Sequence, residues 1–148
     1  MTLVVSFGAG VDSTAMLIEM KHRAIRPDLI LFADTGAERP ETYANVGRMS
    51  AWCESVGFPA IRTVRYVPPV APYRTLEGEC LQNRTLPSLA FGMKSCSAKW
   101  KVKPQQRHIR AWLAEHGLER SPRRAFLRGR FHPLPSTLDP LPGPPGPP

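Results

Sequence analysis

The chain has 148 residues, of which 42% are hydrophobic, and its 20 Lys and Arg against 12 Asp and Glu give a formal net charge of +8. This length predicts one domain, and the charge favours an anionic partner, whether a nucleotide, a nucleic acid or a sulfated metabolite. The N-terminus lacks the pattern of a secretory signal, and no apolar run approaches the roughly 20 residues of a membrane helix. We therefore expect a cytoplasmic protein without a membrane partner.

The first predicted elements are a strand over residues 3–7 and a helix over 13–24, joined by a loop of small residues. Residues 8–10 of that loop read Gly-Ala-Gly, which lets backbone N–H groups come close to a ligand. Ser13 and Thr14 add hydroxyl groups beside the positive end of the helix dipole. The stretch indicates an anion site with phosphate as the favoured ligand, and an ordinary capped turn is the alternative.

Two common phosphate-binding patterns do not fit this loop. A Walker loop would have Lys where Asp12 stands, and the dinucleotide fingerprint would have Gly where Ser13 stands. If the loop binds phosphate, it does so by a different arrangement.

The next elements continue the alternation, with a strand over residues 29–34, a helix over 40–56 and a strand over 60–66. This order predicts an α/β fold: a parallel, Rossmann-like sheet with helices on both faces and the carboxyl ends of its strands along one edge. Ligands of such sheets bind at that edge. Cys53 falls on the apolar face of helix 40–56, so we expect a buried hydrophobic residue rather than a reactive thiol.

Asp34 ends the second predicted strand, and Thr35 and Gly36 form a turn that would expose it. At the edge of a parallel sheet, this carboxylate could hold Mg²⁺ through water or accept a hydrogen bond from a ribose or an adenine amine. A turn carboxylate that caps helix 40–56 is the alternative.

A basic segment with helical character is predicted over residues 97–117, after an irregular stretch. A continuous helix would carry a basic stripe, unless the proline at 104 breaks its register, and the stripe consists of Lys99, Lys103, Arg107 and Arg110. Contact of Lys99 or Lys101 with phosphate or sulfate is one reading, and a solvated basic face is the other. Cys96 lies among these cations, which favour the thiolate form.

No metal site and no disulfide framework are predicted from the three cysteines. A site made of Cys80, Cys96 and His108 would lack the paired spacing that is typical of zinc ligands. Residues 1–118 are expected to form the domain, and residues 119–148 a basic and then Pro- and Gly-rich tail without order. Because this tail supplies no further strands, the predicted sheet could be incomplete.

Three stretches in this order, SFGAGVDST, DTGAERPETY and CSAKWKVKP, resemble the PP-loop adenine nucleotide α-hydrolase superfamily. The nearest likeness is to its phosphoadenosine phosphosulfate (PAPS) reductase-like branch, of the phage and bacterial type. Members cleave ATP between its α and β phosphates to adenylate a substrate, or reduce PAPS with a catalytic cysteine and thioredoxin.

The resemblance implies ATP or PAPS as the bound nucleotide, with Mg²⁺ as a possible companion. Catalytic roles are expected for Asp12 and Lys99, and for Cys96 if it, or Cys80, substitutes for the reductase nucleophile. The resemblance assigns nucleotide binding to Ser6, Phe7, Gly8, Ala9, Gly10, Asp12, Ser13, Thr14, Asp34, Thr35, Gly36 and Lys101. The usual C-terminal cysteine motif of the reductases is absent, and so is a cysteine set for an iron–sulfur cluster.

The expected function is therefore adenylation or sulfonucleotide chemistry on an adenine nucleotide, with thioredoxin as a partner only for a reductase. A truncated nucleotide-binding module without turnover is the first alternative. A basic nucleic-acid-binding protein, with Tyr66 and Trp100 as stacking groups, is the second. Assembly into a homodimer stays open.

Overall fold

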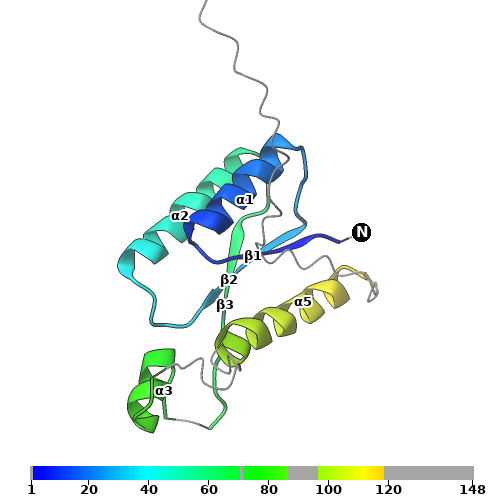
Figure 1. Ribbon diagram of the computed structural model, residues 1–148. Coiled ribbons are helices and arrows are strands. Elements are labelled where there is room, and N and C mark those ends of the chain that lie inside the picture. Colours follow the sequence, from blue (N-terminus) through cyan, green and yellow to red (C-terminus); the bar gives the residue numbers. More distant parts are fainter. Residues whose placement is uncertain (1, 71, 87–96, 119–148) are drawn as a thin grey trace, which may run out of the picture.

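The computed structural model describes residues 2–70, 72–86 and 97–118, and its centre is a parallel three-stranded sheet (Figure 1). The strands are β1 (Val4–Phe7), β2 (Leu29–Asp34) and β3 (Ile61–Arg65), in the order β1-β2-β3. In the register of the sheet, Val4 lies opposite Leu29, and Ile30 lies opposite Ile61. The parallel sheet with intervening helices confirms the predicted α/β class.

Helices cover both faces of this sheet (Figure 1). Helices α1 (Val11–His22) and α2 (Pro40–Ser55) pack on one face, and α5 (Lys103–Glu115) packs on the other. The first core contains Val5, Phe7, Ile30, Phe32, Leu17, Met20, Met49 and Cys53. The second contains Leu29, Leu31, Ala33, Val64, Ile109 and Trp112. Alternate residues of the strands therefore supply two separate apolar layers.

The central strand β2 is buried along its whole length. Its sequence, LILFAD, is apolar on both faces until Asp34, as expected for a strand with a helical layer on each side. The strand thereby brings a single carboxylate to the carboxyl edge of the sheet, beside the loop that leaves β1.

One helix begins earlier than predicted, and another was not predicted. Helix α1 begins at Val11, before the predicted residue 13, because Gly10 rather than a hydroxyl residue occupies its N-cap. Helix α3 (Leu76–Asn83) lies in the stretch that was predicted to be irregular. It begins where the Thr75 hydroxyl accepts a hydrogen bond from the Gly78 N–H at 3.0 Å.

The segment predicted as one helix over residues 97–117 has two parts. Residues Ala98–Val102 form the π-helical element η2, and α5 follows directly. Pro104 lies in the first turn of α5, and the helical backbone continues across it from η2, so this proline marks the change from π-helix to α-helix rather than breaking the helix.

None of the helices in the described part of the chain has the length and apolar character needed to cross a bilayer. The tail predicted over residues 119–148 lies outside the described residues.

Candidate functional site

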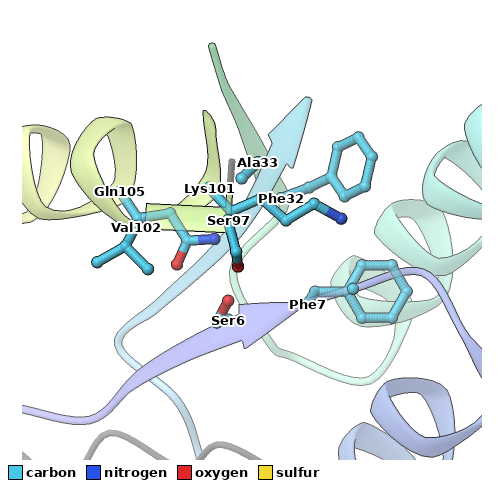
Figure 2. Close-up of a pocket in the computed structure, with 9 residues that line it drawn as sticks. Ser6, Phe7, Phe32, Ala33, Ser97, Lys101, Val102 and Gln105 are labelled. Carbon is cyan, nitrogen blue, oxygen red and sulfur yellow. The ribbon is translucent and has the colours of Figure 1, made fainter. Parts of the chain in front are cut away.

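A pocket of about 200 Å³ opens at the carboxyl ends of β1 and β2, against η2 and the start of α5 (Figure 2). Its lining comes from four segments and consists of Ser6, Phe7, Gly8, Phe32, Ala33, Ser97, Lys101, Val102 and Gln105. The structure thus brings together four residues that the sequence assigned to nucleotide binding: Ser6, Phe7, Gly8 and Lys101. They lie at the edge where parallel α/β sheets bind their ligands.

Five residues of this pocket were not predicted from the sequence: Phe32, Ala33, Ser97, Val102 and Gln105. Of these, Gln105 carries the longest polar side chain. Its side chain is only 5% exposed, and its amide makes no hydrogen bond within the described residues. In Figure 2 the amide points toward the space that the hydroxyls of Ser6 and Ser97 also face. Because the amide lines the pocket, it is suited to a ligand that both donates and accepts hydrogen bonds.

A sequence signal for Gln105 exists. Ile109 and Trp112 follow it by four and seven residues, which places all three on the buried face of one helix. A polar residue on such a face is an exception that calls for a partner.

The loop between β1 and α1 is held by α2. The Asn45 side-chain amide donates to the Ala9 carbonyl at 3.0 Å, and Ala9 has a left-handed backbone with φ of 58°. A Cβ atom added to Gly10 would meet nothing within 4 Å, so the space above the loop is open. The small residues of the loop therefore leave its backbone accessible from that side.

The N-terminus of α1 adjoins this loop and has no side-chain cap, because its N-cap residue is Gly10. The Ser13 hydroxyl donates to the Gly10 carbonyl at 3.0 Å, while Asp12 is exposed in the first turn. The Thr14 hydroxyl oxygen is buried and has no partner within the described residues. The first N–H groups of α1 and the positive end of its dipole are thus available to an anion.

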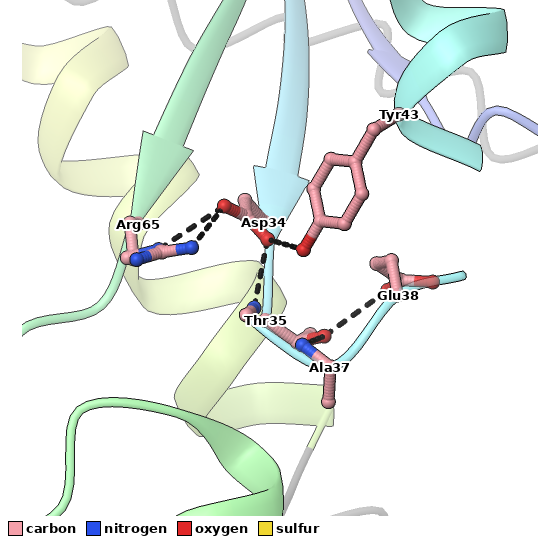
Figure 3. A network of polar contacts seen from close by, with 7 residues as sticks. Asp34, Thr35, Ala37, Glu38, Tyr43 and Arg65 are labelled. Atoms are coloured by element: carbon pink, nitrogen blue, oxygen red, sulfur yellow. Dashed lines mark hydrogen bonds and ion pairs between the residues drawn. The ribbon is translucent and has the colours of Figure 1, made fainter. Parts of the chain in front are cut away.

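Asp34 is bound by the chain itself rather than open to a ligand (Figure 3). One carboxylate oxygen accepts from the Gly36 N–H at 2.7 Å and from the Tyr43 hydroxyl at 2.8 Å. The other accepts from Arg65 Nε at 3.1 Å and Nη2 at 2.5 Å. Burial raises the pKa of this carboxyl, but these hydrogen bonds and the Arg65 charge outweigh burial and hold the pKa below its usual range.

These contacts fit the alternative in which Asp34 is a turn carboxylate at the start of α2. It binds the Tyr43 side chain, however, rather than capping the backbone of that helix. Thr35, which is 2% exposed, donates through its hydroxyl to Glu38 at 3.2 Å. Gly36 has φ of 71°, and a Cβ there would come within 2.5 Å of Thr75 Cγ2. All three residues fix the turn between β2 and α2, and none of them lines the pocket.

The side chains of Lys99 and Lys101 lie in different parts of the structure and have different partners. The Lys99 ammonium pairs with Glu79 of α3 and donates to the Tyr73 hydroxyl at 3.0 Å. Burial lowers the pKa of Lys99, but its contacts with Glu79 and Tyr73 have the larger effect and raise the pKa above its ordinary value. The ammonium therefore stays charged at neutral pH. Lys99 joins η2 to α3 outside the pocket, whereas Lys101 lines the pocket and lies 3.4 Å from Glu38.

The structure describes two of the three cysteines, Cys53 and Cys80. Cys53 is fully buried in the first core, where burial raises the pKa of its thiol to about 11, which confirms the predicted hydrophobic role. Cys96, which was expected to act as a substitute nucleophile, lies outside the described residues. Within the described residues, no group of three or more His, Cys, Asp and Glu side chains is arranged to hold a metal ion.

Comparison with protein-family models, with curated proteins and with solved structures finds no match to this chain.

Proposed function

We propose that this chain is a PAPS reductase-like PP-loop protein that binds an adenine nucleotide at the carboxyl edge of its sheet. The observation that carries the proposal is the pocket in which Ser6 and Gly8 of the first stretch meet Lys101 of the last. These residues come from two of the three stretches that carry the resemblance, and they are far apart in the sequence.

The phosphates would lie over residues 8–10 and the uncapped N-terminus of α1, where backbone N–H groups and the helix dipole stabilise negative charge. Lys101 adds a cation on the opposite side. The exposed Asp12 carboxylate is suited to a Mg²⁺ ion that the phosphates also bind. The base would occupy the pocket, with its polar edge toward Gln105 and the hydroxyls of Ser6 and Ser97.

Of the two family chemistries, we favour adenylation with ATP. It requires mainly that the phosphates are positioned and that their developing charge is neutralised, which the loop, the α1 N-terminus and Lys101 are arranged to do. Reduction of PAPS needs a thiolate, and Cys53 is buried away from the pocket with a raised pKa. A reductase would therefore depend on Cys80 or Cys96.

The proposal is tested by calorimetric titration of Lys101→Gln with ATP plus Mg²⁺ and, separately, with PAPS. A charge-assisted contact is worth about 1.5–3 kcal/mol, so we expect affinity to fall by roughly 10- to 100-fold. Arg48→Gln is the matched control, since Arg48 is exposed on α2 and its loss changes the charge equally. Equal affinity of the two variants would contradict the placement of the phosphates.

A product assay separates the remaining alternatives. Release of pyrophosphate from ATP in the presence of an acceptor would support adenylation, and release of sulfite from PAPS with thioredoxin would support reduction. Tight nucleotide binding without either product would favour the module without turnover.

A further inference from the structure

A second concavity, of about 300 Å³, lies between the end of β3 and the first turns of α5. We call it the basic groove, and its lining consists of Arg65, Tyr66, Val67, Lys103, Pro104, Gln106, Arg107 and Arg110. It shares no lining residue with the nucleotide pocket. The groove is therefore a separate site on the same domain.

The groove has strong uncompensated positive charge. Lys103, Arg107 and Arg110 are exposed, and none of them forms an ion pair within the described residues. Arg65 is paired with Asp34, yet its side chain keeps 45% of its surface exposed. No acidic residue lines the groove, so an anionic ligand would meet no internal competitor there.

The spacing of these cations suits a chain of phosphates. Lys103, Arg107 and Arg110 follow one face of α5, and seven residues of helix extend over roughly 10 Å. Three cations distributed over that length can contact neighbouring phosphates of one strand. Guanidinium groups also bind phosphate oxygens in a two-point geometry that a single ammonium group does not provide.

Tyr66 gives the groove an aromatic wall. Its ring packs edge-to-face on Trp100, with 5.2 Å between the ring centroids, which fixes its position. Aromatic rings beside a cationic track are typical of proteins that bind single strands, because bases stack on them. A lipid surface is a poor fit, since the apolar side chains Ile109 and Trp112 of α5 are buried against the sheet.

We propose that the basic groove binds the phosphodiester backbone of a single-stranded nucleic acid. This function goes beyond nucleotide binding in the pocket and does not depend on it. The contacts are electrostatic, with Lys103, Arg107 and Arg110 on successive phosphates and Tyr66 against a base.

The test is fluorescence anisotropy of a labelled oligo(dT) strand, titrated with the full chain over a series of NaCl concentrations. One variant replaces Lys103, Arg107 and Arg110 with Gln. The matched control replaces Arg23, Arg48 and Arg84, three exposed cations outside the groove, with Gln. The cations of residues 119–131 are present in both variants, so their contribution cancels.

For single strands the slope of log K against log[NaCl] is about −0.7 per phosphate contact, so loss of three contacts should reduce its magnitude by about 2. We expect the groove variant to lose at least tenfold in affinity and the control variant to stay within twofold of the wild type. Equal affinities and slopes for both variants would overturn the proposal.

Two further arms of the test examine the ligand and the site. Equally tight binding of polyglutamate, or of a duplex of the same length, would contradict a single-strand site. ATP affinity measured on the groove variant should remain at the wild-type value, because the pocket keeps all its residues. Loss of strand binding with unchanged ATP affinity would therefore support the groove independently of the proposed nucleotide function.

Discussion

Asp34 shows how a single residue can be placed at a binding edge and still serve the fold. Its carboxylate receives donors from the Gly36 backbone, Tyr43 of α2 and Arg65 of β3. Because every donor comes from a different segment, the residue fastens the end of β2 to both neighbours. Sequence position alone could not distinguish this role from ligand binding.

Protonation of Asp34 should destabilise the protein in acid. The folded carboxyl has a pKa below its ordinary value of 3.8, so the unfolded chain binds the proton more tightly. The stabilisation is complete well above pH 3.8 and is lost as the pH falls below that value. Asp34→Asn should lower the unfolding free energy at pH 7 and flatten its fall in acid, as measured by urea unfolding at several pH values.

Tyr43→Phe serves as a milder companion to that variant, since it removes one donor to the carboxylate and leaves Arg65 in place. The unfolding free energy should therefore fall more steeply in acid for Tyr43→Phe than for Asp34→Asn. If the unfolding free energy of Asp34→Asn fell in acid as steeply as that of the wild type, the role assigned to this carboxylate would be contradicted.

Gly36→Ala should be strongly destabilising. The new Cβ would come within 2.5 Å of Thr75 Cγ2, and φ at this position is 71°, where L residues are strained. Overpacking and strain together predict a loss of about 2–4 kcal/mol in the free energy of unfolding, measured with urea.

The matched control is Gly47→Ala, at an exposed position of α2 where a Cβ meets nothing within 4 Å. This change should stabilise the protein by about 0.5–1 kcal/mol, because alanine favours helix. If both variants were equally stable, the turn at Gly36 would not be constrained as described.

Gln105→Leu should affect stability and binding differently. Removal of an amide that lines the pocket and makes no hydrogen bond within the described residues should leave the melting temperature near the wild-type value. Loss of its hydrogen bonds to a base should weaken ATP binding by roughly tenfold, since a good hydrogen bond is worth about 1 kcal/mol or slightly more. A lower melting temperature with unchanged ATP affinity would show that the amide serves only the fold.

At the scale of elements, α3 is attached to η2 by a polar cluster rather than by a hydrophobic core. Helix α3 has no buried residue, and Glu79 accepts from Lys99, Trp100 and Tyr73. Burial raises the pKa of Glu79, but these donors hold it below its usual range. The Lys99 ammonium also lies over the rings of Tyr66 and Tyr73, at 5.5 and 5.1 Å from their centroids.

Lys99→Met should therefore loosen α3. We expect faster amide hydrogen exchange over residues 76–83 and a loss of about 1–3 kcal/mol in unfolding free energy, because Glu79 keeps its charge without its partner. Lys101→Met, which removes a weaker and more exposed pair with Glu38, should leave both measurements near the wild type. Unchanged exchange over residues 76–83 in Lys99→Met would contradict the role assigned to this ion pair.

Across the whole molecule, apolar patterning was sufficient to predict the sheet and its layers. The strand over residues 29–34 was predicted with its observed bounds, because an unbroken apolar run suits only the centre of a covered sheet. Helix α3 was missed because its stability rests on a cap and an ion pair, which leave no apolar period to detect.

The candidate site was predictable in its loop and less so in its last segment. The basic stripe assumed a regular helix, but the i→i+5 bonding of η2 shifts the register, so Lys99 turns to α3 while Lys103, Arg107 and Arg110 stay together. The sequence left open whether Lys99 or Lys101 contacts an anion, and only Lys101 lines the pocket. Register in such a segment depends on tertiary contacts that spacing does not encode.

The most direct test of the account is an amide NMR titration of the ¹⁵N-labelled chain with ATP and Mg²⁺, and separately with PAPS. The account predicts saturable shifts at Gly8, Gly10, Ser13 and Lys101, with no larger changes at residues 65–67 of the basic groove. No saturable shifts with either nucleotide, or shifts confined to the groove, would contradict nucleotide binding at the carboxyl edge of β1 and β2.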